Sequence, residues 1–151
     1  MTSSSLPPSI AARLWVWAAA LRILKRIVPV ESLVRLMHTS PGAQQRPDVE
    51  AKLRRYLQMT GTFPHRAPGN CLERSLGAYR ILCAAGAQPD LVIGVRRGTD
   101  GRVEGHVWIR TAAGPLGETG SSLAGFAVLA TFDASASRGA TTSVIPRLRF
   151  R

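Results

Sequence analysis

The stretch "GNCLERSLGAYRILCAAG", residues 69–86, predicts the helix that organises this fold. Asn70 is a favoured N-cap residue, and Gly86 is typical of the position just after a helix ends. Cys71 then occupies the first helical position, where unpaired backbone amides stabilise a negatively charged sulfur. Apolar side chains at three- and four-residue steps form one stripe: Leu72, Leu76, Tyr79, Leu82 and Cys83. A small apolar residue that happens to start a helix is the plain alternative for Cys71.

The residues after this helix predict an antiparallel sheet. "LVIGV" (91–95) is a continuous apolar run, which favours a strand buried on both faces. "VEGHVWIR" (103–110) follows a turn with an Asp-Gly hairpin signal and is expected to be the second strand. "PLGET" (115–119) is expected to be the third strand, and "FAVLATF" (126–132) the fourth.

The residues before Asn70 predict helices. Residues 14–28 place apolar side chains on one helical face, for which core packing is the first interpretation and attachment to a membrane or partner protein the second. Pro29 ends that helix, residues 30–37 predict a second, and residues 48–59 predict a third. Three helices followed by a helix and an antiparallel sheet place the chain in the α+β class.

The chain is expected to form a single structural domain, with a helical segment of residues 1–69 packed on a core of residues 70–151. The net charge is +11, with 10 basic and 3 acidic residues in the first segment and 10 and 6 in the second. A basic surface suits an acidic partner. Dispersed arginines and few aromatic side chains disfavour nucleic acid, so no nucleic-acid partner is expected.

The two cysteines are expected to stay reduced. Cys71 and Cys83 lie about 18 Å apart along one helix, whereas a disulfide needs Cα atoms within about 7 Å. Free thiols suit a reducing compartment, so the expected location is the cytoplasm. Arg22 and Lys25 interrupt the apolar segment of residues 14–28, and no stable membrane span is expected.

Cys71 and His106 form the candidate catalytic pair. A thiol nucleophile needs an imidazole within hydrogen-bond reach, and the imidazole needs a third group that selects its tautomer. Because side chains alternate along a strand, His106 shares the more polar face with Trp108, which either walls a substrate cleft or simply packs. Glu118 would share this face if the connecting loop has an odd number of residues, for instance three with Gly114 in the left-handed conformation. An even loop would place the carboxylate on the opposite face.

Other interpretations of these residue types stay open. Glu104 looks along its own strand and is a weaker orienting group, while Asp133 is a rival for that role. A zinc site built from Cys71, His65 and His106 lacks paired-ligand spacing, so no metal is expected.

The ordered segments "NCLERSLGAYRILCAAG", "PDLVIGV", "GHVWIR" and "GPLGE" resemble the transglutaminase-like cysteine peptidases that remove leader peptides from lasso-peptide precursors. The resemblance covers residues 70–118, about a third of the chain. It implies a transglutaminase-like (papain-like) core in which Cys71 is the nucleophile, His106 the base and Glu118 the orienting acid. Val107 stands where alanine is usual, and Glu118 stands where aspartate is more common.

The resemblance also implies a function and partners. Such a cysteine protease cuts the leader from a ribosomally made precursor, and a separate ATP-dependent cyclase then joins the freed amine to an acidic side chain. Leader recognition in this family belongs to a winged-helix domain. Residues 1–69 are expected to be helical and lack its strands, so a separate leader-binding protein is expected as partner. The cleavage needs no cofactor, and Asn70 and Trp108 are expected to contact the substrate.

Two rival functions remain at this stage. An acyltransferase could use the same three residues, with an amine in place of water. A basic module that binds peptides or nucleic acid without catalysis would make Cys71 incidental. Product mass separates the first rival from a peptidase, and thiol reactivity separates the second.

Overall fold

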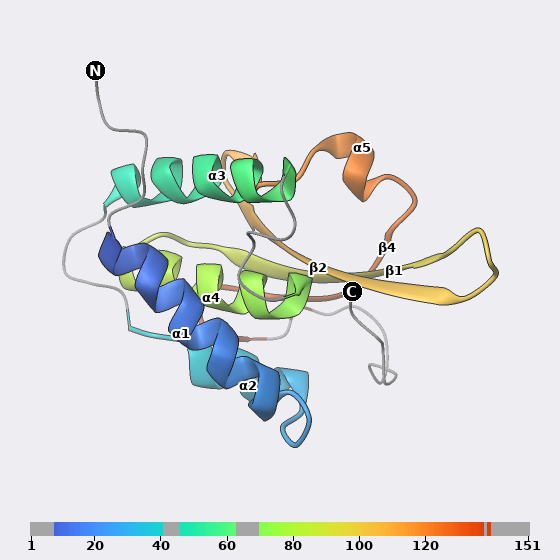
Figure 1. Cartoon of the computed structure of the whole chain (residues 1–151), viewed down its shortest axis with the longest axis horizontal. Helices are drawn as coiled ribbons and strands as arrows, with labels where there is room; N and C mark the ends of the chain where they lie inside the picture. The colour runs from blue at the N-terminus through green and yellow to red at the C-terminus, as the bar shows by residue number, and fades with distance from the viewer. Residues whose placement is uncertain (1–7, 41–45, 63–69, 138, 140–151) are drawn as a thin grey trace.

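The computed structural model describes residues 8–40, 46–62, 70–137 and 139 of the chain. Its elements follow the order α1, α2, α3, α4, β1, β2, β3, α5, β4, so the chain has the α+β fold expected from its sequence. Figure 1 shows that α4 lies along the sheet and that α1 crosses α4. Within the described residues, no helix is long and apolar enough to cross a membrane.

The helices begin and end close to the expected positions. The first, α1 (Pro8–Leu24), ends before Pro29, which was expected to end it, and residues 25–29 separate it from α2 (Val30–Met37). The third, α3 (Pro47–Thr62), extends beyond the expected residues 48–59. The central helix, α4 (Cys71–Ala84), has Asn70 as its N-cap, as predicted.

Four strands form one antiparallel sheet in the order β3-β2-β1-β4. They are β1 (Asp90–Arg97), β2 (Val103–Thr111), β3 (Gly114–Pro115) and β4 (Ala127–Phe132). β1 lies between β2 and β4, which explains why its residues 91–94 are apolar and buried. The register pairs Gly94 with His106, so the centre of β1 supports the strand that carries the candidate base.

The third strand is a correction to the sequence analysis. It contains two residues, Gly114–Pro115, instead of the expected residues 115–119. Gly117 has a φ of 73°, which turns the backbone out of the extended conformation before Glu118. A short helix, α5 (Gly120–Leu123), follows and was not expected. Because β3 ends early, much of one edge of β2 has no strand partner among the described residues.

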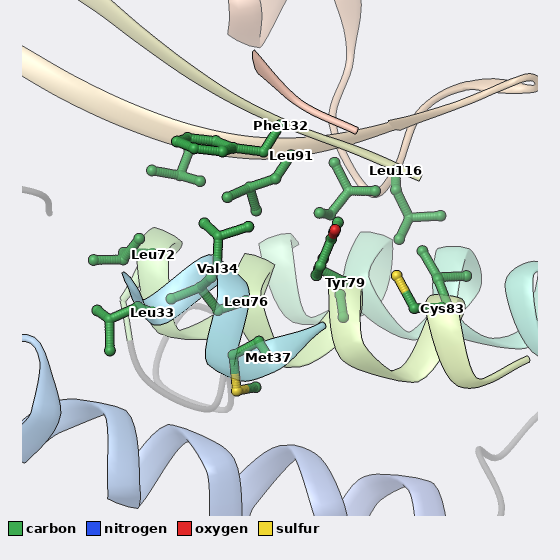
Figure 2. Packing of buried hydrophobic residues seen from close by; sticks show 14 of the residues in the cluster. Leu33, Val34, Met37, Leu72, Leu76, Tyr79, Cys83, Leu91, Leu116 and Phe132 are labelled. Atoms are coloured by element: carbon green, nitrogen blue, oxygen red, sulfur yellow. The ribbon is translucent and has the colours of Figure 1, made fainter. Parts of the chain in front are cut away.

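The hydrophobic core lies between α4 and the sheet and continues beneath α1, α2 and α3. Figure 2 shows the apolar stripe of α4 facing the strands. The buried residues labelled there include Leu72, Leu76, Tyr79, Cys83, Leu91 and Phe132. Leu14 and Leu21 of α1 and Leu53 of α3 belong to the same cluster. Both segments of the chain thus bury apolar surface in one core, which is the main favourable contribution to folding.

Candidate active site

Cys71 is the first residue of α4, and a capping box holds this end of the helix. The Asn70 side chain accepts a hydrogen bond from the Glu73 amide at 3.1 Å. The Glu73 carboxylate in turn accepts one from the Asn70 amide, also at 3.1 Å. This reciprocal pair defines where the helix begins, and therefore where the Cys71 sulfur lies. Cys71 is 4% exposed, so the sulfur is enclosed by neighbouring side chains.

Glu73 also ties this helix end to α1. Its side chain is 2% exposed, and a Lys25 Nζ lies 2.6 Å from Glu73 Oε1. Arg22 approaches the same carboxylate at 3.7 Å. A carboxylate this deeply buried requires such partners, because desolvating an unpaired charge is costly. Glu73 was not among the expected site residues, although Asn70 and Glu73 have the Asn-x-x-Glu spacing of a capping box.

The unpaired edge of β2 brings α4 to the candidate base. The Leu116 amide donates to the Ile109 carbonyl, so that carbonyl points toward β3. The Val107 carbonyl, two residues earlier, points the same way, but β3 has ended before reaching it. Ser75 Oγ donates a hydrogen bond to this carbonyl at 2.9 Å, in place of the backbone amide that a longer β3 would supply. One turn after Cys71, α4 is thereby fastened to the backbone beside His106.

Aromatic side chains pack against the His106 ring. Its ring centroid lies 6.0 Å from that of Trp108, in a stacked arrangement, and 5.3 Å from that of Phe126. Trp108 covers Gly94 of β1, where a Cβ atom would lie 2.8 Å from the indole ring. Trp108 is 7% exposed and lines the cavity at this site, so it both packs and borders the cavity. Phe126 was not among the residues expected at the site.

His106 contacts both of its expected partners. Its Nε2 lies 3.0 Å from Glu118 Oε1, and the Cys71 side chain is near enough to the imidazole to raise the pKa of His106. Burial on its own would lower the pKa of His106. The hydrogen bonds and charges of Cys71 and Glu118 outweigh that effect and raise the pKa to about 9. With Nε2 bound to the carboxylate, Nδ1 is the ring nitrogen left for the Cys71 proton.

Glu118 reaches His106 by a route that the sequence analysis did not foresee. The pairs Thr111–Gly114 and Arg110–Pro115 leave a two-residue loop, so the expected odd loop is wrong. Gly114 does have a positive φ, 94°. Continuing this even register would place Glu118 opposite Val107, on the wrong face. The turn at Gly117 abolishes the register and redirects the next side chain toward His106.

Gly117 is required at that turn for a second reason. A Cβ atom there would lie 2.5 Å from the Leu57 side chain of α3. The position thus combines a backbone conformation that favours glycine with close contact to a neighbouring helix. α3 therefore helps to set the direction in which Glu118 points.

Further groups keep the Glu118 carboxylate ionised. Ser122 Oγ, in α5, lies 2.8 Å from Glu118 Oε2. Burial tends to raise the pKa of Glu118, but hydrogen bonds with His106 and Ser122, together with the charges of His106 and Arg74, lower it. Neither Ser122 nor Arg74 was predicted for this role, because α5, which carries Ser122, was not expected and Arg74 lies on the distant helix α4.

The rival orienting groups are engaged elsewhere. Glu104 forms an ion pair with Arg96 at 3.0 Å. The Asp133 carboxylate accepts hydrogen bonds from Ser135 and Ser137. The register places Asp133 after the end of β4, two strands away from His106 and about four residues further along the sheet. That separation is on the order of 15 Å, well beyond hydrogen-bond reach.

A cavity of about 270 Å³ opens beside the His106–Glu118 pair. Arg74 and Glu118 supply charged groups to its wall, while Leu57 and Leu116 supply apolar ones. No group of three or more metal-ligating side chains occurs among the residues that the structure describes. His65, the third member of the zinc alternative, lies outside those residues.

Comparison with known proteins agrees with this architecture. A model of the transglutaminase-like superfamily matches residues 14–131, which is more than half of the chain. The match begins in α1 and ends in β4, so it includes the helices before Cys71 as well as the sheet. No curated protein and no solved structure gives a significant match. This chain therefore belongs to the transglutaminase-like superfamily.

Proposed function

We propose that this protein is a cysteine peptidase that removes the leader peptide from a lasso-peptide precursor. The observation that carries the proposal is the pair of contacts made by His106, with the Cys71 side chain on one side and Glu118 on the other. Cysteine peptidases need this order of groups, because the imidazole must exchange a proton with sulfur while a carboxylate holds its tautomer. The choice of substrate rests on the sequence resemblance over residues 70–118.

In the proposed reaction, the Cys71 thiolate attacks the carbonyl carbon of the bond between leader and core. The resulting oxyanion is received by backbone amides at the start of α4, which have no partner within the helix. His106 donates its proton to the departing core amine, and the leader remains as a thioester on Cys71. His106 then takes a proton from water, the hydroxide attacks the thioester, and the leader leaves with a free carboxylate.

The remaining residues of the site support this sequence of steps. Glu118 stabilises the imidazolium and keeps Nδ1 directed toward Cys71. The capping box of Asn70 and Glu73 holds the helix end that receives the oxyanion. Trp108 and Asn70 border the place where we expect the substrate chain to pass.

An acyltransferase is the second candidate, because the transglutaminase-like superfamily is named for enzymes in which an amine takes the place of water. The same thioester would then react with an amine and yield an amide. The two outcomes differ in product mass, since only hydrolysis releases a leader with a free carboxylate.

The proposal includes two partners. A separate winged-helix protein presents the leader, and an ATP-dependent cyclase takes the freed core amine. We therefore expect slow cleavage by this chain alone at low micromolar precursor, and faster cleavage when the leader-binding protein is added. Full-speed cleavage without that protein would exclude it as a required partner.

The decisive experiment compares the two cysteines on the precursor peptide. Replacing Cys71 by alanine should abolish leader cleavage, because no other described nucleophile contacts His106. Cys83→Ala is the matched control, since this cysteine is buried in the core and should affect stability only. Mass spectrometry of the products measures both cleavage and hydrolysis. Equal loss of activity in the two folded variants would overturn the assignment.

A further inference from the structure

A second groove, of about 400 Å³, lies away from the candidate active site. It opens where the first residues of α1, the start of α3 and the C-terminal end of α4 come together, at the left of Figure 1. Its lining shares no residue with the cavity beside His106. The proposed peptidase chemistry does not use it.

Positive charge dominates the groove. Arg13, Arg46 and Lys52 line it, against one carboxylate, that of Asp48. Lys52 Nζ lies 3.1 Å from Asp48 Oδ2, so these two charges offset one another. The side chains of Arg13 and Arg46 make no hydrogen bond or ion pair with any residue that the structure describes. The charge of Arg46 acts on the Asp48 carboxylate, but neither guanidinium is hydrogen-bonded within the described residues, so both can bind an anionic ligand.

The floor of the groove is apolar. Val49 is 8% exposed, and Ile81 is partly buried against the core. A ligand that fills this groove would bury apolar side chains as well as present a carboxylate. A single phosphate is too small for a groove of this volume, and the lining holds no aromatic ring on which a nucleic-acid base could stack. An acidic peptide with apolar side chains matches both properties.

We propose that this groove binds an acidic, partly apolar segment of the substrate's leader peptide. The inference rests on the proposed function for the identity of the peptide. α4 separates the groove from Cys71, because the groove touches Ala84 and Ala85 at the far end of this helix. The helix axis between the two ends is about 20 Å long. An extended peptide covers this distance with about six residues, so the acidic segment lies at least that far from the cleaved bond.

The test measures peptide binding separately from catalysis. The full chain with Cys71→Ala is titrated against two fluorescein-labelled synthetic peptides of about twelve residues, one alternating Glu and Leu and the other Gln and Leu. Fluorescence anisotropy in about 0.15 M salt reports the affinity. We expect the Glu peptide to bind at least about tenfold more tightly than the Gln peptide. Equal binding, or no binding of the Glu peptide, would overturn the proposal.

Matched variants separate the groove from the general attraction of a basic protein. The double change Arg13→Gln and Arg46→Gln should weaken binding of the Glu peptide about tenfold or more. The control is Arg97→Gln with Arg102→Gln, two exposed arginines near the β1–β2 turn, which removes the same charge and should cost less than about twofold. Equal losses in the two double variants would mean that net charge alone attracts the peptide, and the groove would be rejected.

These outcomes stay distinct from those that test the proposed function. If the wild-type chain cuts no precursor but shows the groove-dependent binding, the groove proposal stands and the leader-peptidase assignment is wrong. If the chain cuts the precursor but binds both peptides equally, the peptidase assignment stands and the groove proposal is wrong.

Discussion

The two ends of α4 each carry a buried cysteine, and their surroundings differ. Cys71 is 4% exposed and Cys83 is 2% exposed, so burial does not distinguish them. Cys71 is the first residue of the helix and contacts an imidazole that is itself bound to a carboxylate. Cys83 lies on the apolar stripe, where burial raises its pKa to about 11. The neighbouring groups, rather than exposure, decide which sulfur can act as a nucleophile.

The acidic residues near the two cysteines, Glu118 and Asp133, differ in the same way. At the first end, Glu118 binds a ring nitrogen of His106 at 3.0 Å. At the other end, the Tyr79 hydroxyl donates to the backbone carbonyl of Asp133 at 2.6 Å, and the Asp133 carboxylate turns to nearby serines. Burial is the main cause that raises the pKa of Tyr79 well above its usual range, so its hydroxyl stays protonated near neutral pH and cannot serve as a base. One end holds groups poised for proton transfer, and the other holds groups that complete the core.

The largest expected difference between the two ends is thiol reactivity. At about pH 6, iodoacetamide should label Cys71 at least about 10³-fold faster than Cys83, because a thiol with a pKa near 11 is almost entirely protonated. Peptide mass spectrometry after timed labelling measures both rates in one sample. Cys71→Ala is the control and should remove the fast reaction. Equal labelling rates would contradict the contrast between the two ends and favour a non-catalytic module.

The next largest effect concerns the acid that orients His106. Glu118→Gln should lower the turnover of leader cleavage by about 10²- to 10³-fold, less than the roughly 10⁴-fold loss in a serine triad. The thiolate–imidazolium pair depends less on its third member, because the helix N-terminus already stabilises the thiolate. Glu118→Asp should lower turnover only mildly, and Asp133→Asn should change turnover by less than about twofold. If Asp133→Asn is the crippled variant instead, Asp133 replaces Glu118 in the triad.

A smaller effect is expected from the ion pair that fastens the active end of α4. Lys25→Met should reduce the free energy of unfolding by about 2 kcal/mol, because it leaves the Glu73 carboxylate buried with only a weaker partner. That partner is Arg22, at 3.7 Å. Lys52→Met, which breaks the exposed pair with Asp48, should cost less than about 0.5 kcal/mol. Urea unfolding curves give both values, and equal costs would mean that the pair with Glu73 does not anchor the helix.

The smallest effect is the response to alkaline pH. The pKa of His106 is raised from 6.5 to about 9, so its protonation stabilises the folded state. That contribution is fully present below about pH 6.5 and is lost as the pH rises through 9. Leader cleavage should fall about tenfold between about pH 8 and pH 10, because His106 loses the proton that it donates to the amine. A rate that still rises above pH 9 would argue against His106 as the acid.

Much of the fold could be predicted from local patterns. Asn70 as N-cap, the stripe of α4 and the boundaries of α2 follow from capping chemistry and a 3.6-residue period. The placement of His106 away from the core follows from alternation along β2, because Val107 and Ile109 face the core. Cys83 in the core was predicted for the same reason as the rest of its stripe. These features depend on residues within one or two turns of each other.

What only the tertiary structure decided is how the separate segments meet. The even loop before β3 would have turned Glu118 away from His106, and the turn at Gly117, packed against Leu57, brings it back. Glu73 meets Lys25, and Ser75 meets the edge of β2, across distances in the chain that no local pattern spans. The sequence by itself determined which elements form and which residues are chemically suited to a site. Their mutual geometry was decided by packing, because a single left-handed residue or an unpaired strand edge can redirect a side chain without changing any periodic pattern.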